Sequence, residues 1–104
     1  ILGFTFKENC PDVRNTRVID IVKELTDYDV NITIYDPWAN PEEVMHEYGV
    51  KVLNEMPDKK FDSVVLAVAH NEFKTFKLEK VVYENSVVFD VKGMLSIETV
   101  DGRL

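Results

Sequence analysis

Three basic side chains near the start of the chain are of the type that binds phosphate. Lys7, Arg14 and Arg17 lie within the first 17 residues, where only Glu8 and Asp12 oppose them, so this segment has a net charge of +1. The whole chain has a net charge of −7, and the positive character is therefore local. Lysine and arginine form charge-assisted hydrogen bonds to phosphate oxygens. The segment is a candidate anion site, although an ordinary solvent-exposed helix start carries similar charges.

Four other residues could take part in catalysis or recognition. His70 follows an apolar run and could be a general base, but the sequence shows no partner for it, which favours a hydrogen-bonded structural histidine. Cys10 could be an activated nucleophile, yet no base is paired with it. We therefore expect no catalytic residue in this chain. Trp38 could stack on a ring or pack at a domain contact, and Lys92, beside Gly93, could reach a phosphate.

The composition excludes several classes of function. A chain of 104 residues with 45% hydrophobic and 30% charged residues predicts one soluble globular domain. Its negative charge argues against nucleic acid and membrane partners, and no apolar run approaches the length of about 20 residues that spans a bilayer. Two widely spaced His and one Cys predict no metal site. A single Cys cannot form an internal disulfide, which favours a cytoplasmic location.

The chain alternates strand-like and helix-like segments. β-Branched runs predict strands, whereas apolar residues spaced three and four apart predict helices, with Asn15 or Thr16 as one cap and Asn40 as another. Strands are expected at 1–6, 31–35, 50–53, 63–68 and 87–91, and helical segments at 18–25, 41–48, 70–76 and 78–83. This alternation predicts an α/β fold: a three-layer, doubly wound, mostly parallel sheet with helices on both faces, forming a single domain over 1–104.

The carboxyl ends of parallel strands share one edge of a sheet, and ligands bind there. We therefore expect Lys7, Arg14 and Lys92 to lie along this edge, although more than eighty residues separate the ends of the set. A dinucleotide-binding turn has the pattern G-x-G-x-x-G, but the first turn of this chain follows a lone Gly3. The sequence therefore argues against an ordinary dinucleotide-binding domain, and the first turn offers cationic side chains where a phosphate would be bound instead.

Residues 3–16, with the core Phe-Lys-x-x-x-x-Asp-x-Arg, resemble the segment that opens the C-terminal UDP-binding domain of the UDP-glucose/GDP-mannose dehydrogenase family. Tyr35-Asp36-Pro37, Ala69-His70 and Phe89-Asp90-Val91-Lys92-Gly93 agree with that family in order. The resemblance covers nearly the whole chain and is greatest to members that oxidise UDP-N-acetylhexosamines to uronates for bacterial surface polysaccharides. It implies a Rossmann-like fold.

The resemblance also implies roles for particular residues. Lys7 matches a lysine that contacts the nucleotide sugar, Phe6 lines the same pocket, and Arg14 matches an arginine that reaches toward NAD. Lys92 stands where many members have a substrate-binding arginine, and lysine lacks the bidentate fork of that residue. The family's nucleophilic cysteine and main NAD-binding domain lie elsewhere in the longer protein, so Cys10 is not given that role.

The same resemblance implies that the chain is a fragment of a longer dehydrogenase that forms a homo-oligomer, and the start at Ile1, inside an expected strand, favours this. The fragment alone is expected to be inactive. Two alternatives stay open. One is a receiver-like signalling module, although such a module needs an acidic pair where Phe6 and Lys7 stand. The other is an interaction domain without a ligand.

Overall fold

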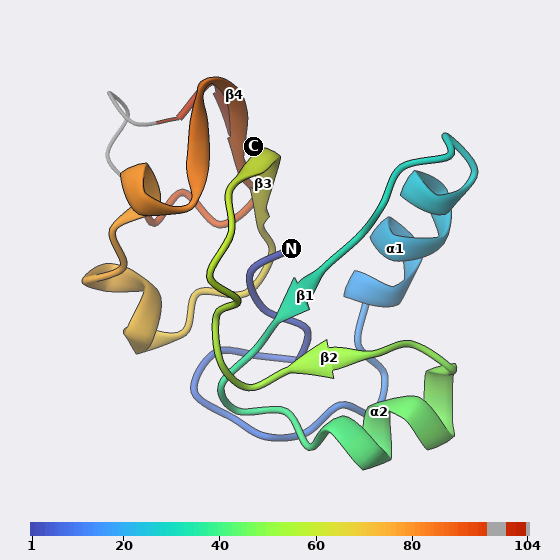
Figure 1. The fold of residues 1–104 in the computed structure, drawn as a ribbon. Helices are drawn as coiled ribbons and strands as arrows, with labels where there is room; N and C mark the ends of the chain where they lie inside the picture. The colour runs from blue at the N-terminus through green and yellow to red at the C-terminus, as the bar shows by residue number, and fades with distance from the viewer. Residues whose placement is uncertain (96–99, 104) are drawn as a thin grey trace.

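The computed structural model describes residues 1–95 and 100–103 and shows an α/β fold built on a parallel sheet (Figure 1). Its strands, all paired in parallel, are β1 (Ile34–Tyr35), β2 (Val52–Leu53), β3 (Phe61–Leu66), β4 (Val82–Asp90) and β5 (Gly102–Arg103). Leu2 forms parallel bridges to both Tyr35 and Leu66. It therefore joins the β1–β2 pair to the β3–β4–β5 group, in the order β2-β1-Leu2-β3-β4-β5. The expected parallel arrangement is confirmed.

The first strand is much shorter than the expected 1–6, because only Leu2 pairs as a strand. Gly3 adopts a φ of +96°, outside the strand region, and lies against Val68. The chain turns there, and the N–H groups of Phe4 and Thr5 donate to the Asp36 carboxylate instead of to a neighbouring strand. The strand expected at 31–35 is likewise reduced to Ile34–Tyr35.

Two α-helices cover one face of the sheet. α1 (Val18–Thr26) begins after Arg17, which occupies the N-cap position without a side-chain hydrogen bond, so the cap expected at Asn15 or Thr16 is wrong by position. The Thr16 hydroxyl, one residue earlier, still accepts from the Val18 N–H. α2 (Pro41–Tyr48) is capped by Asn40 and ends at Gly49, which adopts a φ of 70°. Their apolar sides pack with residues of the sheet in one buried cluster, which contains Phe4, Val13, Val18, Ile19, Val22, Ile34, Ala39, Val44, Val52, Ala67 and Val68.

The opposite face is covered by two short 3₁₀ helices, η1 (Asn71–Lys74) and η2 (Leu78–Lys80). Phe73 and Leu78 from these helices pack with Leu2, Val64, Leu66, Val81 and Val88 in a second cluster. The three-layer arrangement is therefore confirmed, with α-helices on one face and 3₁₀ turns on the other. The helical segment expected at 78–83 ends early, because the Val81 carbonyl accepts from the Phe61 N–H and the chain enters β4 at Val82.

Candidate functional site

The loops that follow the parallel strands converge at the carboxyl edge of the sheet. The loop after Leu2 lies against the segment after β3: the Asn9 N–H donates to His70 Nδ1 at 2.9 Å, and the Asn71 N–H donates to Asn9 Oδ1 at 2.8 Å. Asp36 and Asp90 occupy the corresponding positions at the ends of β1 and β4. This edge therefore combines loops from four places in the sequence.

Asp36 connects several of these segments through hydrogen bonds, and its carboxylate is fully buried. Oδ2 accepts from His70 Nε2 at 2.9 Å and from the N–H groups of Phe4 and Thr5 at 2.6 and 3.0 Å. Oδ1 accepts from the N–H groups of Trp38 and Ala39 at 2.7 and 3.2 Å. Burial alone would raise the pKa of this carboxyl, but the hydrogen bond from His70 and those from backbone N–H groups outweigh it and hold the pKa below its usual value.

His70 is fully buried and has hydrogen-bond partners on both ring nitrogens, as we expected of a structural histidine. The Trp38 ring stacks on it with 6.0 Å between ring centroids, and Phe73 packs against it at 5.6 Å. Trp38 Nε1 in turn donates to Glu72 Oε1 at 2.9 Å. Trp38 thus covers the buried Asp36–His70 pair at the carboxyl edge.

Phe6 and Lys7 lie on the loop that this buried pair holds, and both side chains are exposed, Phe6 by 54%. The loop is closed by a hydrogen bond from the Phe6 N–H to the Asp12 carbonyl at 2.8 Å. The Thr5 hydroxyl donates to the Lys7 carbonyl at 3.0 Å. The backbone under Lys7 is thus fixed, while its ammonium group is presented to solvent.

Arg14 is also exposed, but its charge is paired. Its Nε lies 3.0 Å from Asp12 Oδ1 and its Nη2 lies 3.4 Å from Asp12 Oδ2. Hydrogen bonds from Arg14 lower the pKa of Asp12, and the same pairing raises the pKa of Arg14. This contact holds the guanidinium at the surface of the loop.

Lys92 lies in a turn organised by Asp90, which is fully buried. The Asp90 carboxylate accepts from the N–H groups of Lys92, Gly93 and Leu95 at 2.9, 2.8 and 2.6 Å. Gly93 adopts a φ of 68°, which glycine tolerates best. The exposed Lys92 therefore follows β4 at the same sheet edge as the loop that carries Lys7.

The sequence analysis named Asp36 and Asp90 only as parts of motifs shared with the family and gave them no role. A signal was available, because aspartate after a strand commonly accepts from backbone N–H groups two and three residues later. Asn9, which links the first loop to His70, was missed entirely. Asparagine tolerates the left-handed φ of 56° that it adopts here, but its partner His70 lies 61 residues away and no local pattern indicates that contact.

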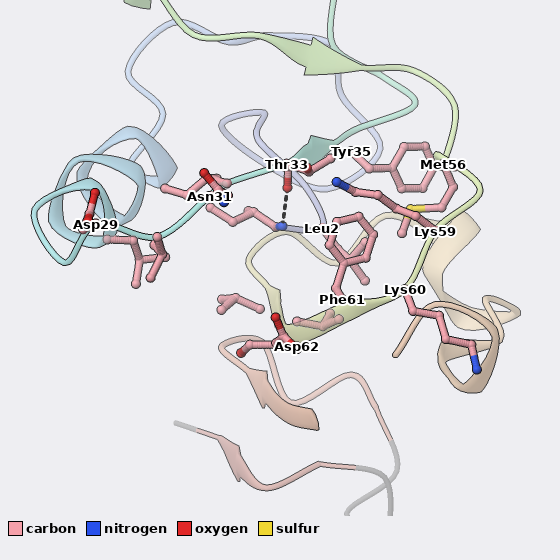
Figure 2. A pocket seen from close by; sticks show the side chains of 17 residues that line it. Leu2, Asp29, Asn31, Thr33, Tyr35, Met56, Lys59, Lys60, Phe61 and Asp62 are labelled. Carbon is pink, nitrogen blue, oxygen red and sulfur yellow. Dashed lines mark hydrogen bonds between the residues drawn. The ribbon is translucent and has the colours of Figure 1, made fainter. Parts of the chain in front are cut away.

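A pocket of about 580 Å³ lies at the opposite, amino edge of the sheet. Figure 2 shows Asn31 and Thr33 on one side of it and Phe61 and Asp62 on the other, with Leu2 between them. None of the residues expected to bind a ligand lines it. Among residues 1–95 and 100–103, no group of three or more His, Cys, Asp or Glu side chains could hold a metal ion.

The fold and the cationic loops at its carboxyl edge define a Rossmann-like, ligand-binding α/β domain without a glycine-rich dinucleotide loop. This chain belongs to the UDP-glucose/GDP-mannose dehydrogenase family, whose UDP binding domain matches residues 1–97. The resemblance found in the sequence is thereby confirmed. In the described part of the chain, no helix has the length and apolar character needed to cross a membrane.

Curated relatives agree with this assignment. The whole chain aligns with UDP-N-acetyl-D-glucosamine 6-dehydrogenases of Salmonella typhi, at 46% identity, and of Pseudomonas aeruginosa, at 43%, and covers 25% of each. A UDP-N-acetyl-D-mannosamine dehydrogenase of Methanococcus aeolicus is 31% identical over 92% of the chain and 22% of that relative. The chain therefore spans about a quarter of the length of these relatives.

Proposed function

We propose that this chain is the UDP-sugar-binding domain of an NAD-dependent UDP-sugar 6-dehydrogenase that makes a UDP-uronate for surface polysaccharide biosynthesis. The observation that carries the proposal is the presentation of Lys7: an exposed cation on a loop that is hydrogen-bonded to the buried residues Thr5 and His70 at the carboxyl edge of a parallel sheet. The similarity to dehydrogenases of UDP-N-acetylhexosamines supports this substrate class.

In this proposal Lys7 and Lys92 contact the diphosphate, and the exposed ring of Phe6 packs against the nucleoside. Ammonium groups attract phosphate oxygens, and a pre-formed loop loses little entropy when it binds. Fixing the diphosphate also fixes the distant sugar carbon, so binding energy far from the reaction helps to orient the reacting atoms.

The cofactor that would supply the hydride acceptor in such an oxidation is NAD. This chain is suited to only a minor role in binding NAD, because the chain lacks the glycine-rich loop. The group that we expect to contribute is Arg14. Arginine has five N–H donors, and Asp12 engages those of Nε and Nη2. The remaining nitrogen of the guanidinium, Nη1, is the one we assign to a cofactor phosphate.

We also propose that the chain is one domain of a longer cytoplasmic enzyme that forms a homo-oligomer and carries its nucleophile and main NAD site elsewhere. The length of the relatives supports the longer chain, because the two dehydrogenases compared above are each about four times as long as this chain.

A UDP titration followed by NMR tests the binding part of the proposal. Wild-type chain is expected to bind UDP weakly, and Lys7→Ala is expected to lose about 1.5–3 kcal/mol, or roughly ten- to a hundredfold in affinity. Lys60→Ala is the matched control, because it removes the same charge at the amino edge, just before β3. Equal affinities of wild type and Lys7→Ala would remove Lys7 from the site.

Two parallel assays separate the proposal from the alternatives. Incubation with NAD and UDP-N-acetylhexosamines should form no NADH, because the chain holds neither a dinucleotide loop nor a paired nucleophile; measurable NADH would contradict the domain assignment. A thermal-shift panel should show stabilisation by UDP. Stabilisation by Mg²⁺ with a phosphate mimic, and not by UDP, would favour the receiver-like alternative, and no response would favour an interaction domain.

A further inference from the structure

We propose that Asp36 and His70 are positioning residues that set the loop from Thr5 to Asn9 for ligand binding by Lys7. The inference rests on the proposed function, since it concerns how the same site is held in shape. In this proposal the buried imidazole of His70 holds an exposed binding loop in the shape that binds the ligand.

The hydrogen bonds define which nitrogen of His70 carries the proton. The Asn9 N–H can only donate, so His70 Nδ1, 2.9 Å away, must accept. A neutral ring then has its proton on Nε2, which lies 2.9 Å from Asp36 Oδ2 and 3.1 Å from Thr5 Oγ1. The Thr5 hydroxyl donates its own proton to the Lys7 carbonyl, so its oxygen can accept from Nε2. The donors and acceptors in this series of hydrogen bonds are therefore mutually consistent.

Both ends of the loop are therefore attached to the same ring. Thr5 is bound at the Nε2 side and Asn9 at the Nδ1 side, and the exposed residues 6–8 lie between them. Asn9 reinforces the attachment through its side chain, which accepts from the Asn71 N–H. Releasing Nδ1 would free the far end of the loop without removing Lys7 itself.

Asp36 orients the ring. Its buried carboxylate attracts the Nε2 proton, which leaves Nδ1 as the acceptor that Asn9 needs. The same carboxylate binds the N–H groups of Phe4 and Thr5 at the near end of the loop. Through these hydrogen bonds, the Asp36–His70 pair connects the end of β1 to both ends of the loop that follows Leu2.

Two substitutions of His70 separate positioning from general stability. His70→Gln keeps an amide N–H at the ε position, where it can donate to Asp36, but has no acceptor at the δ position. His70→Asn has the reverse arrangement, because its Oδ1 can accept from Asn9. We expect UDP affinity to fall roughly fivefold in His70→Gln and to recover to within about twofold of wild type in His70→Asn.

A double-mutant cycle tests whether His70 acts through Lys7. If the loop is released in His70→Gln, the further change Lys7→Ala should weaken UDP binding much less than it does in the wild-type background. Glu72→Gln is the matched control on η1, since an amide oxygen can still accept from Trp38, and its UDP affinity should equal that of wild type. If His70→Gln does not fold, Thr5→Val gives the second test, because it removes the hydroxyl that holds the Lys7 carbonyl.

The ring nitrogens can be examined directly by ¹⁵N NMR of labelled histidine, without any ligand. The expected result is a neutral ring protonated at Nε2, with slow hydrogen exchange at the Asn9 amide that becomes fast in His70→Gln. A proton on Nδ1, or wild-type UDP affinity in His70→Gln, would overturn the positioning role. A wild-type chain with the expected ring state that binds no UDP would overturn the proposed function, and with it the role given to this pair.

Discussion

Two buried aspartates at strand ends organise the loops on which the site depends. Asp36 accepts four backbone N–H groups and Asp90 accepts three. A carboxylate can accept several hydrogen bonds at once, and such charge-assisted bonds are stronger than neutral ones. The backbone N–H groups of these loops have no neighbouring strand to pair with. One aspartate at the end of a strand accepts their hydrogen bonds instead.

Asp36→Asn is expected to destabilise the fold by about 3 kcal/mol, because the amide nitrogen cannot accept and leaves buried donors unpaired. The substitution should also change the response to acid. The folded pKa of Asp36 lies below its unfolded value of 3.8, so the carboxylate contributes stability above 3.8 that is lost as the pH falls through the folded pKa. Urea unfolding at neutral pH and below pH 4 measures both effects. An equal acid dependence in the two proteins would contradict this account.

At the scale of elements, the turn at Gly3 decides where the first strand ends. A Cβ at this position would lie 2.6 Å from Val68 Cβ and 2.8 Å from the Val68 backbone nitrogen. The φ of +96° is one that other residues rarely adopt. Close approach of two backbones therefore directs the chain toward Asp36 and into the binding loop.

Gly3→Ala is expected to destabilise the fold by about 3 kcal/mol or more, because a steric clash adds to backbone strain. Gly49→Ala is the matched control: its φ is +70°, but nothing lies within 4 Å of its added Cβ, so strain of about 1–2 kcal/mol is the only cost. Denaturant unfolding of both variants measures the difference. Similar losses would mean that the contact with Val68 does not limit this position.

At the scale of the whole molecule, the two edges of the sheet differ in character. The carboxyl edge has loops closed by buried hydrogen bonds, whereas the amino edge has the pocket around Ile1 (Figure 2). The Ile1 amino group donates to the Thr33 carbonyl at 2.7 Å, and burial lowers its pKa from 8.0 to about 6. A peptide N–H would form the same hydrogen bond without a buried charge.

The stability of the 104-residue chain is therefore expected to rise between pH 6 and pH 8, by about 2–3 kcal/mol in total. In that window the unfolded amino group still binds a proton and the folded one has lost it, so stability increases with pH. Acetylating the terminus removes the charge and should abolish this rise, as should extending the chain before Ile1. Urea unfolding across this range compares the forms. The same slope in the acetylated chain would assign the effect to another group.

The sequence by itself determined the types of element, the parallel arrangement of the strands and the edge at which their loops meet. These properties depend on local signals: β-branched runs for β3 and β4, the Asn40 cap and Gly49 for α2, and the right-handed connections that follow from chirality. Family membership was also readable, because the motif at residues 3–16 is contiguous.

Only the tertiary structure decided how the site is held. Asp36 meets His70 across 34 residues and His70 meets Asn9 across 61, and such pairings leave no local pattern. The length of the first strand depended on the approach of Gly3 to Val68, and β5 in the final segment depended on pairing with β4. A buried polar group must form a hydrogen bond, and its partner is often distant in the sequence. Long-range contacts of this kind therefore decide which of the locally possible conformations a segment adopts.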